Sequence, residues 1–237
     1  MNTARSESCT LAHPLHRGWK VFLVAASLLF SLGYVALAVI AWGWRDWVGF
    51  FDGAPRSFVC LGMIVLFVGT FLFGCNVSTG RHDRPRNNWI FLPMFLVGLA
   101  MGWLPPYDDR RNIWTLAGHW APYFGMLAFF AGTVLRIGAV RTLGPRHSVW
   151  VAVQEDHHLT TTGLYRFIRH PSYLGALLAV FGWALAFRSV AGLALGTLMI
   201  PPIVSRMAAE EEMLIAEFGS PYREYQRRTR RILPGLY

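Results

Sequence analysis

Long apolar runs follow one another along most of this chain of 237 residues. Six of them lie at residues 21–42, 58–75, 89–104, 119–135, 174–187 and 190–204. A helix needs about 20 residues to cross a hydrocarbon core of about 30 Å, and the runs come near that length, although several are short. They predict an all-α polytopic membrane protein with about six transmembrane helices, the last two of which could instead form a leaning helical hairpin.

Composition agrees with this fold class, because 54% of the residues are hydrophobic and only 15% are charged. Such a balance is typical of integral membrane proteins and leaves no room for a separate soluble catalytic domain. The three cysteines, Cys9, Cys60 and Cys75, do not form an even disulfide framework, and no cysteine–histidine spacing resembles a zinc site. We expect one membrane domain over residues 1–237, without a metal.

The net charge of +9 could suggest a nucleic-acid partner, but the arginines cluster at the ends of the apolar runs. A membrane surface explains this placement, so we expect no nucleic acid. With the N-terminus in the cytoplasm, 17 of the 22 lysines and arginines fall on the cytoplasmic side, and the C-terminus is cytoplasmic too. The first run is too long for a cleaved signal peptide, so it is expected to remain as a span. A bacterial source would place the protein in the inner membrane.

The longest polar stretches are residues 136–173 and 205–237, and the first contains the sequence Gly163-Leu-Tyr-Arg-Phe-Ile-Arg-His-Pro-Ser-Tyr-Leu-Gly175. Proline fits the first turn of a helix, so Pro171 predicts a helix start with His170 as its N-cap. Free N–H groups at that start, together with Arg166 and Arg169, would favour an anionic group. The alternative is that these arginines only anchor the helix end at the membrane surface.

The second polar stretch contains Arg206 and the run Glu210-Glu211-Glu212, followed by Glu217. On a helix, Arg206 and Glu210 lie one turn apart and can pair. We expect Glu212 and Glu217 to be solvated, and at least one of Glu210 and Glu211 to face the first stretch.

An anion site beside a carboxylate suits a zwitterionic amino-acid group. S-adenosylmethionine carries such a group and a sulfonium, which Tyr165 and Tyr173 could attract by cation–π contact. Other zwitterions fit this pattern as well. Arg136 could hold a substrate carboxylate or another anionic head at the bilayer surface, or it could serve only as an anchor.

Two patterns in this half of the chain resemble the isoprenylcysteine carboxyl methyltransferases and their phospholipid methyltransferase relatives. The first is His157-His158-Leu159-Thr-Thr-Thr-Gly163-x-Tyr165-x-x-x-Arg169-His170-Pro171-Ser172-Tyr173-x-Gly175. The second is Arg206-x-x-x-Glu210-Glu211-Glu212, followed by Phe218-Gly219, Tyr222, Tyr225 and Pro234. The resemblance covers residues 132–234, whereas the first four apolar runs carry no motif.

The resemblance implies a helical membrane fold in which residues 136–237 form the cofactor-binding core after the N-terminal helices of residues 1–135. It implies S-adenosylmethionine as cofactor and a tunnel that admits a lipophilic or lipidated substrate from the bilayer. The implied cofactor contacts are His157, His158, Leu159, Gly163, Tyr165, Arg169, His170, Pro171, Tyr173, Glu210 and Glu211. Arg136, Arg206 and Glu211 would be the catalytic residues, which orient a substrate carboxylate near the sulfonium methyl.

The implied reaction is direct methyl transfer, in which an anionic carboxylate needs alignment but no strong base. A phospholipid amine or a small hydrophobic thiol would have to lose a proton, with Glu211 or His170 as the candidate base. A fatty acid or a phenol would also suit a tunnel that faces the bilayer.

Membrane sterol reductases are a second resemblance, since they also carry an Arg-His-Pro-x-Tyr-x-Gly helix and a similar tail, and they bind NADPH. The length of this chain and its Glu210-Glu211-Glu212 run favour the methyltransferases. A transporter or sensor for zwitterions would need ionisable residues deep within spans. The apolar runs contain almost none.

Overall fold

The computed structural model describes residues 17–74, 90–143 and 159–233. Within these ranges the chain is mostly helical and has no β-strand beyond two isolated bridges. The elements are α1 (Arg17–Gly43), η1 (Trp44–Asp46), α2 (Trp47–Asp52), α3 (Ala54–Gly74), α4 (Phe91–Arg111), α5 (Trp120–Leu143), η4 (Gly163–Arg166), α6 (Pro171–Ala186), α7 (Val190–Leu198), α8 (Ile200–Phe218) and α9 (Ser220–Arg228). The predicted all-α fold is confirmed.

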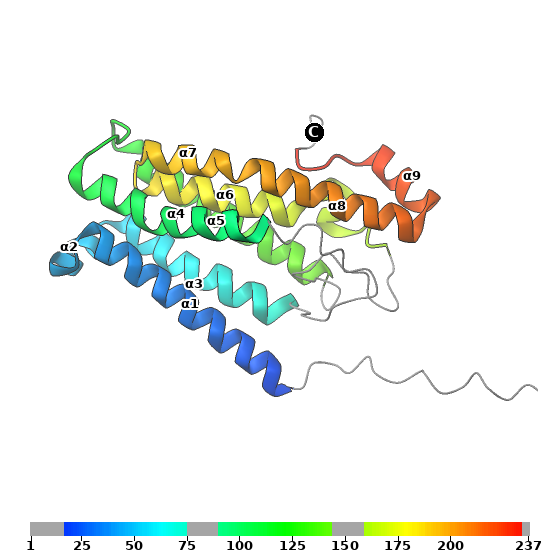
Figure 1. Cartoon of the computed structure of the whole chain (residues 1–237), viewed down its shortest axis with the longest axis horizontal. Helices are drawn as coiled ribbons and strands as arrows, with labels where there is room; N and C mark the ends of the chain where they lie inside the picture. Colours follow the sequence, from blue (N-terminus) through cyan, green and yellow to red (C-terminus); the bar gives the residue numbers. More distant parts are fainter. Residues whose placement is uncertain (1–16, 75–89, 144–158, 234–237) are drawn as a thin grey trace, which may run out of the picture.

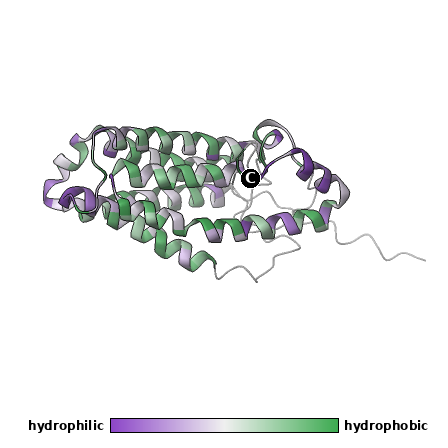
Figure 2. Ribbon diagram, turned by 90° about the horizontal axis from the view of Figure 1, so that it is seen from above, coloured by the Kyte–Doolittle hydropathy of each residue, from purple (hydrophilic) through white to green (hydrophobic). Residues whose placement is uncertain are grey.

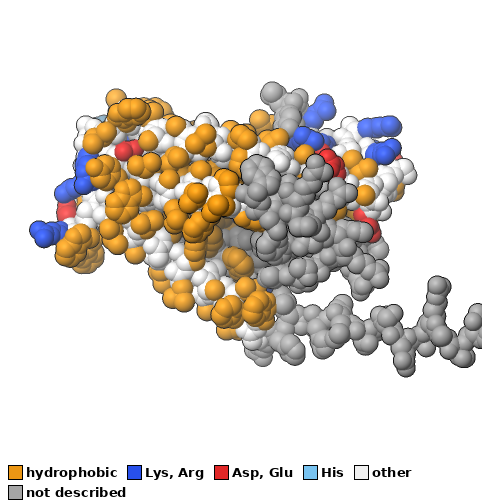
Figure 3. All heavy atoms as spheres, viewed as in Figure 1, with side chains coloured by type: hydrophobic (Ala, Val, Ile, Leu, Met, Phe, Trp, Pro, Cys, Tyr) orange, Lys and Arg blue, Asp and Glu red, His pale blue; other side chains and the backbone are white. Residues whose placement is uncertain are grey.

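The long helices lie side by side along one axis, and α1 slants away from the others toward its own N-terminal end (Figure 1). In the part of the chain that the structure describes, four segments are long and apolar enough to cross a membrane: Gly18–Asp52, Ala54–Gly74, Trp120–Leu143 and Val190–Phe218. α6 is a shorter apolar helix of 16 residues. Hydrophobic residues occupy the middle of the bundle, and hydrophilic ones gather at its two ends (Figures 2 and 3). The protein is therefore an integral membrane protein.

Three helices extend beyond the apolar runs that predict them. α4 continues through Pro105 and Pro106 to Arg111, α5 continues to Leu143, and α8 to Phe218. An apolar run ends where polar residues begin, but a helix continues while its polar side chains find partners or reach the membrane surface. Arg136, which directly follows the apolar run of residues 119–135, therefore lies inside α5, about two turns before the helix ends.

α5 and α6 form the most extensive helix contact in the described chain. Glycines make this contact close: a Cβ on Gly132 would lie 2.5 Å from the carbonyl oxygen of Gly175, and one on Gly125 would lie 2.3 Å from the amide nitrogen of Ala186. Small residues permit such backbone approach between membrane helices. The pair fixes Arg136 on α5 relative to the start of α6.

The buried core lies between these helices and the N-terminal ones. Trp183 of α6 is fully buried and packs against Phe129 of α5, Tyr34 of α1 and Phe187, the residue that follows α6. Its indole N–H donates to the carbonyl oxygen of Met101 in α4 at 2.9 Å, so the polar atom of this large side chain is satisfied.

Two adjacent buried carboxylates connect the helices at the end where α4 finishes. Asp109 accepts from Arg56 at 3.1 Å, from Arg188 at 2.9 Å and from the indole of Trp42 at 3.3 Å. Asp108 accepts from the hydroxyl of Ser189 at 2.6 Å. These contacts join α1, α3, α4 and the turn between α6 and α7.

Candidate functional site

The first polar stretch reaches α6 through a tight turn. Gly163 begins η4 with φ +61°, a left-handed conformation that glycine adopts without strain. Pro171 is the first residue of α6 and His170 is its N-cap, which confirms the helix start that the sequence predicted. The N-cap side chain makes no capping hydrogen bond, so the His170 ring is available for other contacts.

The backbone before α6 pairs with the C-terminal tail. The amide of Arg169 donates to the carbonyl oxygen of Arg230 at 2.8 Å, and that of His170 to Arg231 at 2.9 Å. Ile168 and Arg230 form a parallel bridge. The chain that follows α9 therefore lies directly beside the start of α6.

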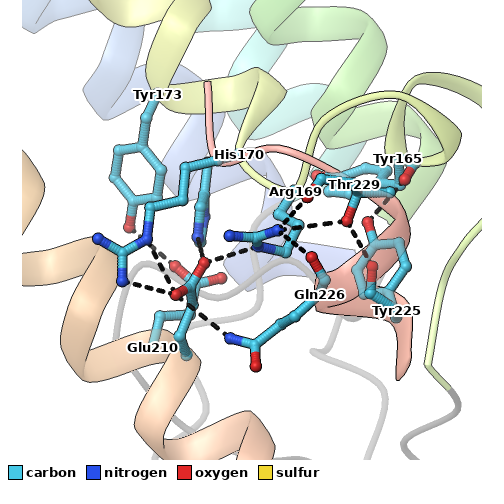
Figure 4. Close-up of polar contacts among 10 residues, drawn as sticks. Tyr165, Arg169, His170, Tyr173, Glu210, Tyr225, Gln226 and Thr229 are labelled. Carbon is cyan, nitrogen blue, oxygen red and sulfur yellow. Dashed lines mark hydrogen bonds and ion pairs between the residues drawn. The ribbon is translucent and has the colours of Figure 1, made fainter. Parts of the chain in front are cut away.

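Glu211 of α8 is the buried carboxylate at this junction, with 4% of its surface exposed. Its Oε1 atom accepts from Arg169 Nε at 2.8 Å and lies 3.2 Å from His170 Nε2. Its Oε2 atom accepts from Arg231 at 2.8 Å and from Gln226 at 3.4 Å (Figure 4). A buried charge is tolerated when it is paired and hydrogen-bonded, as this one is.

Arg169 also fixes the tail through its Nη1 atom, which donates to the carbonyl oxygens of Gln226 and Thr229 (Figure 4). A single side chain thus contacts α8, the end of α9 and the residue after it. Because the guanidinium is planar and carries five N–H donors, it can serve these acceptors together.

A second polar cluster lies one residue earlier on α8. The hydroxyl of Tyr173 donates to Glu210 Oε2 at 3.0 Å and accepts from Arg206 Nε at 2.9 Å. The Arg206 guanidinium lies 5.2 Å from the ring centre of Phe91 at the start of α4. All three polar residues are half-buried, and Arg206 and Glu210 meet at the tyrosine hydroxyl.

Arg136 approaches the same helix start from α5. Its Nη1 atom lies 3.3 Å from both the carbonyl oxygen and the hydroxyl of Ser172 in the first turn of α6. A Cβ on Gly175 would meet the Arg136 backbone at 2.7 Å, so the arginine backbone packs tightly against α6.

Buried tyrosines hold α9 against η4. The hydroxyl of Tyr225 donates to the carbonyl oxygen of Tyr165 at 2.6 Å (Figure 4). Burial raises the pKa of Tyr225 to about 12, and it also raises the pKa values of Tyr165 and Tyr222. These phenols therefore stay protonated and can donate at neutral pH.

The structure brings together most of the residues that the sequence singled out. Arg169, His170 and Glu211 are in direct contact, as are Tyr173, Glu210 and Arg206. This confirms the expectation that a carboxylate of the glutamate run faces the first stretch, and both Glu210 and Glu211 do so. His157 and His158 lie outside the described residues, and Leu159 is the first residue of the last described range.

Sequence reasoning did not single out Arg231, Gln226, Thr229 or Ser172. The excess of arginines in the tail was the available signal for Arg231, since it follows a run of glutamates that needs compensation. Gln226 and Thr229 carry no such signal. Among the described residues, no three His, Cys, Asp or Glu side chains come together as metal ligands.

Fold and site together define an integral membrane protein with a polar site at one end of an apolar helical bundle. A model of the phospholipid methyltransferase family matches residues 120–220. This range begins with α5 and ends at the start of α9, so it includes Arg169, His170 and Glu211 and the Tyr173 cluster, but not the Glu211 partners Gln226 and Arg231.

Several curated proteins are similar over a longer part of the chain. A probable protein-S-isoprenylcysteine O-methyltransferase of Oryza sativa subsp. indica is 25% identical over 183 residues, which cover 76% of this chain and 96% of that protein. The protein-S-isoprenylcysteine O-methyltransferase of Schizosaccharomyces pombe is 33% identical over 172 residues, or 70% of this chain and 63% of that one. Methanethiol S-methyltransferase 2 of Bradyrhizobium diazoefficiens is 34% identical over 163 residues, which cover 64% and 60% of the two chains.

The chain is similar to these membrane methyltransferases over most of its length, and the phospholipid methyltransferase model matches the part that contains α5, α6 and α8. It is an enzyme that transfers a methyl group from a donor to an acceptor.

Proposed function

We propose that the protein transfers the methyl group of S-adenosylmethionine to a lipophilic acceptor at the bilayer interface, and that the acceptor group is a carboxylate like that of an isoprenylcysteine. The observation that carries this proposal is the convergence of the α6 start, α8 and the tail on two adjacent carboxylates at one end of an apolar bundle.

The described side chains fit a zwitterionic donor. The carboxylate Glu210 and the ring of Tyr173 lie together and half-buried, and these groups would bind the ammonium and the sulfonium of such a donor. When bound, S-adenosylmethionine supplies a methyl group on a positively charged sulfur. By family resemblance, His157, His158, Leu159, Gly163 and Pro171 complete the binding residues.

The two carboxylates have different surroundings, which favours different roles. Glu211 is compensated by Arg169 and Arg231 and lies beside His170, so its charge already has partners within the protein. Glu210 accepts from a neutral hydroxyl and is more exposed. We therefore assign the ammonium contact to Glu210, and to Glu211 the task of holding Arg169 and His170 at the α6 start.

Arg136 and Arg206 would orient the acceptor. Both guanidiniums lie at the α6 start on separate helices, and each can donate two parallel hydrogen bonds to a carboxylate. An ionised carboxylate needs no base, so alignment of its oxygen with the methyl carbon and the leaving sulfur contributes much of the rate.

A thiol acceptor is the second candidate, because the similarity to methanethiol S-methyltransferase 2 reaches 34% identity. A thiol or a phospholipid amine has to lose a proton. The His170–Glu211 pair, with 3.2 Å between His170 Nε2 and Glu211 Oε1, is the described group that could accept it.

The test is methyl transfer by the purified full-length protein. Methyl-labelled S-adenosylmethionine is offered with a farnesylated cysteine carboxylate, a phospholipid amine, a fatty acid and methanethiol in parallel. We expect label in the methyl ester of the farnesylated cysteine. Label in methanethiol alone would replace the carboxylate by the thiol, and label in none of them would reject the proposed acceptors.

Binding measurements test the donor separately. S-adenosylhomocysteine should raise the melting temperature of the purified protein, whereas NADPH should not. Stabilisation by NADPH alone would instead support an activity like that of the membrane sterol reductases. Alanine at Arg136 or Arg206 should abolish methyl transfer while the helical circular dichroism stays unchanged, and full activity in both variants would refute the proposed site.

A further inference from the structure

A cavity lies at the end of the bundle opposite the candidate active site. It has a volume of about 260 Å³ and is formed where α3 and α5 begin and where α4 and α6 end. The ionisable side chains that line the cavity are Arg56, Asp109, His119 and Arg188. Neither the proposed donor site nor the proposed acceptor site uses this cavity.

The cavity has an excess of positive charge. Asp109 accepts from both Arg56 and Arg188, so one carboxylate faces two guanidiniums. Within the described residues, Arg56 uses three of its five N–H groups, for Asp109 and for the carbonyl oxygens of Phe50 and Gly49. Arg188 uses two, both for Asp109. The remaining N–H groups of the two arginines can donate to an anion.

Two helix starts add to this charge. Gly53 and Pro55 line the cavity at the beginning of α3, and Gly118, His119 and Pro122 line it at the beginning of α5. The first N–H groups of a helix lack intrahelical partners and carry partial positive charge, so both starts favour an anionic ligand. The ends of α4 and α6 carry partial negative charge at the same cavity, so its excess of positive charge comes from the two arginines.

The surrounding surface indicates the level of the cavity in the membrane. Trp44, Trp47, Trp114 and Trp120 are all highly exposed and lie in the turns and helix ends at this end of the bundle. Exposed tryptophans gather where lipid headgroups meet the hydrocarbon core. A ligand at this depth is surrounded by phospholipid phosphates.

We propose that this cavity binds a phosphate group. The phosphate of a phospholipid headgroup and free inorganic phosphate share this chemistry, and the location beside exposed tryptophans favours the lipid. The bound phosphate would lie across Arg56 and Arg188, with the first turn of α5 beside it.

The test measures the affinity of the purified full-length protein in detergent for a short-chain phosphatidylglycerol and, separately, for inorganic phosphate. His119 is exposed and is not among the hydrogen-bond or ion-pair partners of Asp109, so His119→Glu adds a negative charge to the cavity without breaking the Asp109 network. Repulsion between this carboxylate and an anion in the same cavity should weaken binding by about tenfold or more. His119→Gln is the neutral control, and Ser220→Glu makes the same change of charge at the opposite end.

We expect His119→Glu alone to lose affinity, while His119→Gln and Ser220→Glu stay within about twofold of the unmodified protein. If His119→Glu weakens the binding of phosphatidylglycerol alone, the ligand is the lipid headgroup. If it weakens the binding of inorganic phosphate as well, free phosphate is a ligand of the cavity. Equal binding by His119→Glu and the unmodified protein, or no binding of either probe, would overturn the proposal.

Discussion

Glu211 connects more of the candidate site than any neighbouring side chain does. It accepts from Arg169, Arg231 and Gln226 and contacts His170, which bring the α6 start, α9 and the tail to α8. Removing the charge of Glu211 would leave its arginine partners uncompensated. The loss of a buried ion pair costs more unfolding free energy than an exposed ion pair contributes. The position of the donor-binding residues therefore depends on this carboxylate.

Replacing Glu211 by Gln should lower both stability and activity. The amide cannot compensate Arg169 and Arg231, so we expect a loss of about 3–5 kcal/mol in unfolding free energy. Thermal unfolding in detergent and the affinity for S-adenosylhomocysteine measure the two effects. Glu217→Gln, an exposed change on the same helix, is the control. An unchanged melting temperature in Glu211→Gln would contradict a structural role for the ion pairs of Glu211 with Arg169 and Arg231.

Tyr173→Phe tests the second cluster with a smaller change. It removes the hydroxyl that joins Arg206 to Glu210 and leaves the ring in place. A hydrogen bond to a charged group contributes about 1.5–3 kcal/mol, so kcat/KM should fall by roughly 10- to 100-fold. Steady-state kinetics with both substrates varied will show whether the loss is in KM for the donor or in kcat. Wild-type kinetics in the variant would exclude the hydroxyl from the site.

At the scale of elements, α9 is attached to η4 by a buried hydrogen bond from Tyr225 to the backbone of Tyr165. Because burial raises the pKa of Tyr225 to about 12, the folded chain holds the phenolic proton more tightly than an unfolded chain, in which a tyrosine titrates near pH 10. The stabilisation is complete below about pH 10 and is lost as the pH rises toward about 12.

Tyr225→Phe should therefore change how stability depends on alkaline pH. The melting temperature of the unmodified protein should fall more steeply between pH 9.5 and 11.5 than that of the variant. At pH 8 the variant should be less stable by about 1–3 kcal/mol, because a buried carbonyl oxygen loses its donor. Identical slopes in the two proteins would show that the Tyr225 phenol does not contribute.

The contact between α5 and α6 gives a second prediction at this scale. A Cβ at Gly132 would lie 2.5 Å from the backbone of Gly175, so Gly132→Ala must push the helices apart. Overpacking of this kind costs about 1–3 kcal/mol, and it should also shift Arg136 away from Ser172 and reduce activity. Gly33→Ala is the matched control, because a Cβ at Gly33 has nothing within 4 Å. Equal melting temperatures in the two variants would contradict the close contact.

The sequence predicts elements more completely than it predicts contacts. Apolar length marks six helices, and the geometry of proline places the α6 start at Pro171. The extension of α5 to Leu143 is not predicted, since the apolar run is interrupted at Arg136 although the helix continues. The partners of Glu211 also escape prediction. Arg169 is 42 residues away, and Arg231 is one of five tail arginines that the sequence does not distinguish.

At the scale of the whole molecule, the two ends of the bundle differ in charge chemistry. The end with the candidate site carries α9 and most of the arginines, whereas the other end has five arginines near Asp46, Asp108 and Asp109. The excess of positive charge predicts that the α9 end faces the cytoplasm.

This orientation can be tested with single cysteines in a variant that lacks Cys9, Cys60 and Cys75. Ser220→Cys on α9 and Asp52→Cys on α2 are both exposed and lie at opposite ends. A membrane-impermeant maleimide should label position 52 in intact cells, and position 220 only after the membrane is opened. The reverse pattern would invert the predicted orientation and place the candidate site outside.

The shortness of α6 has a consequence for how the protein enters the membrane. Its 16 residues extend about 24 Å, less than a hydrocarbon core of about 30 Å, so α6 is a weak insertion signal by itself. α5 is synthesised first, and its glycines Gly125 and Gly132 offer α6 a surface of matching shape. Insertion of α6 should therefore depend on an α5 that is already in the bilayer. Errors in biogenesis would then arise at this step, before any polar contact of the site has formed.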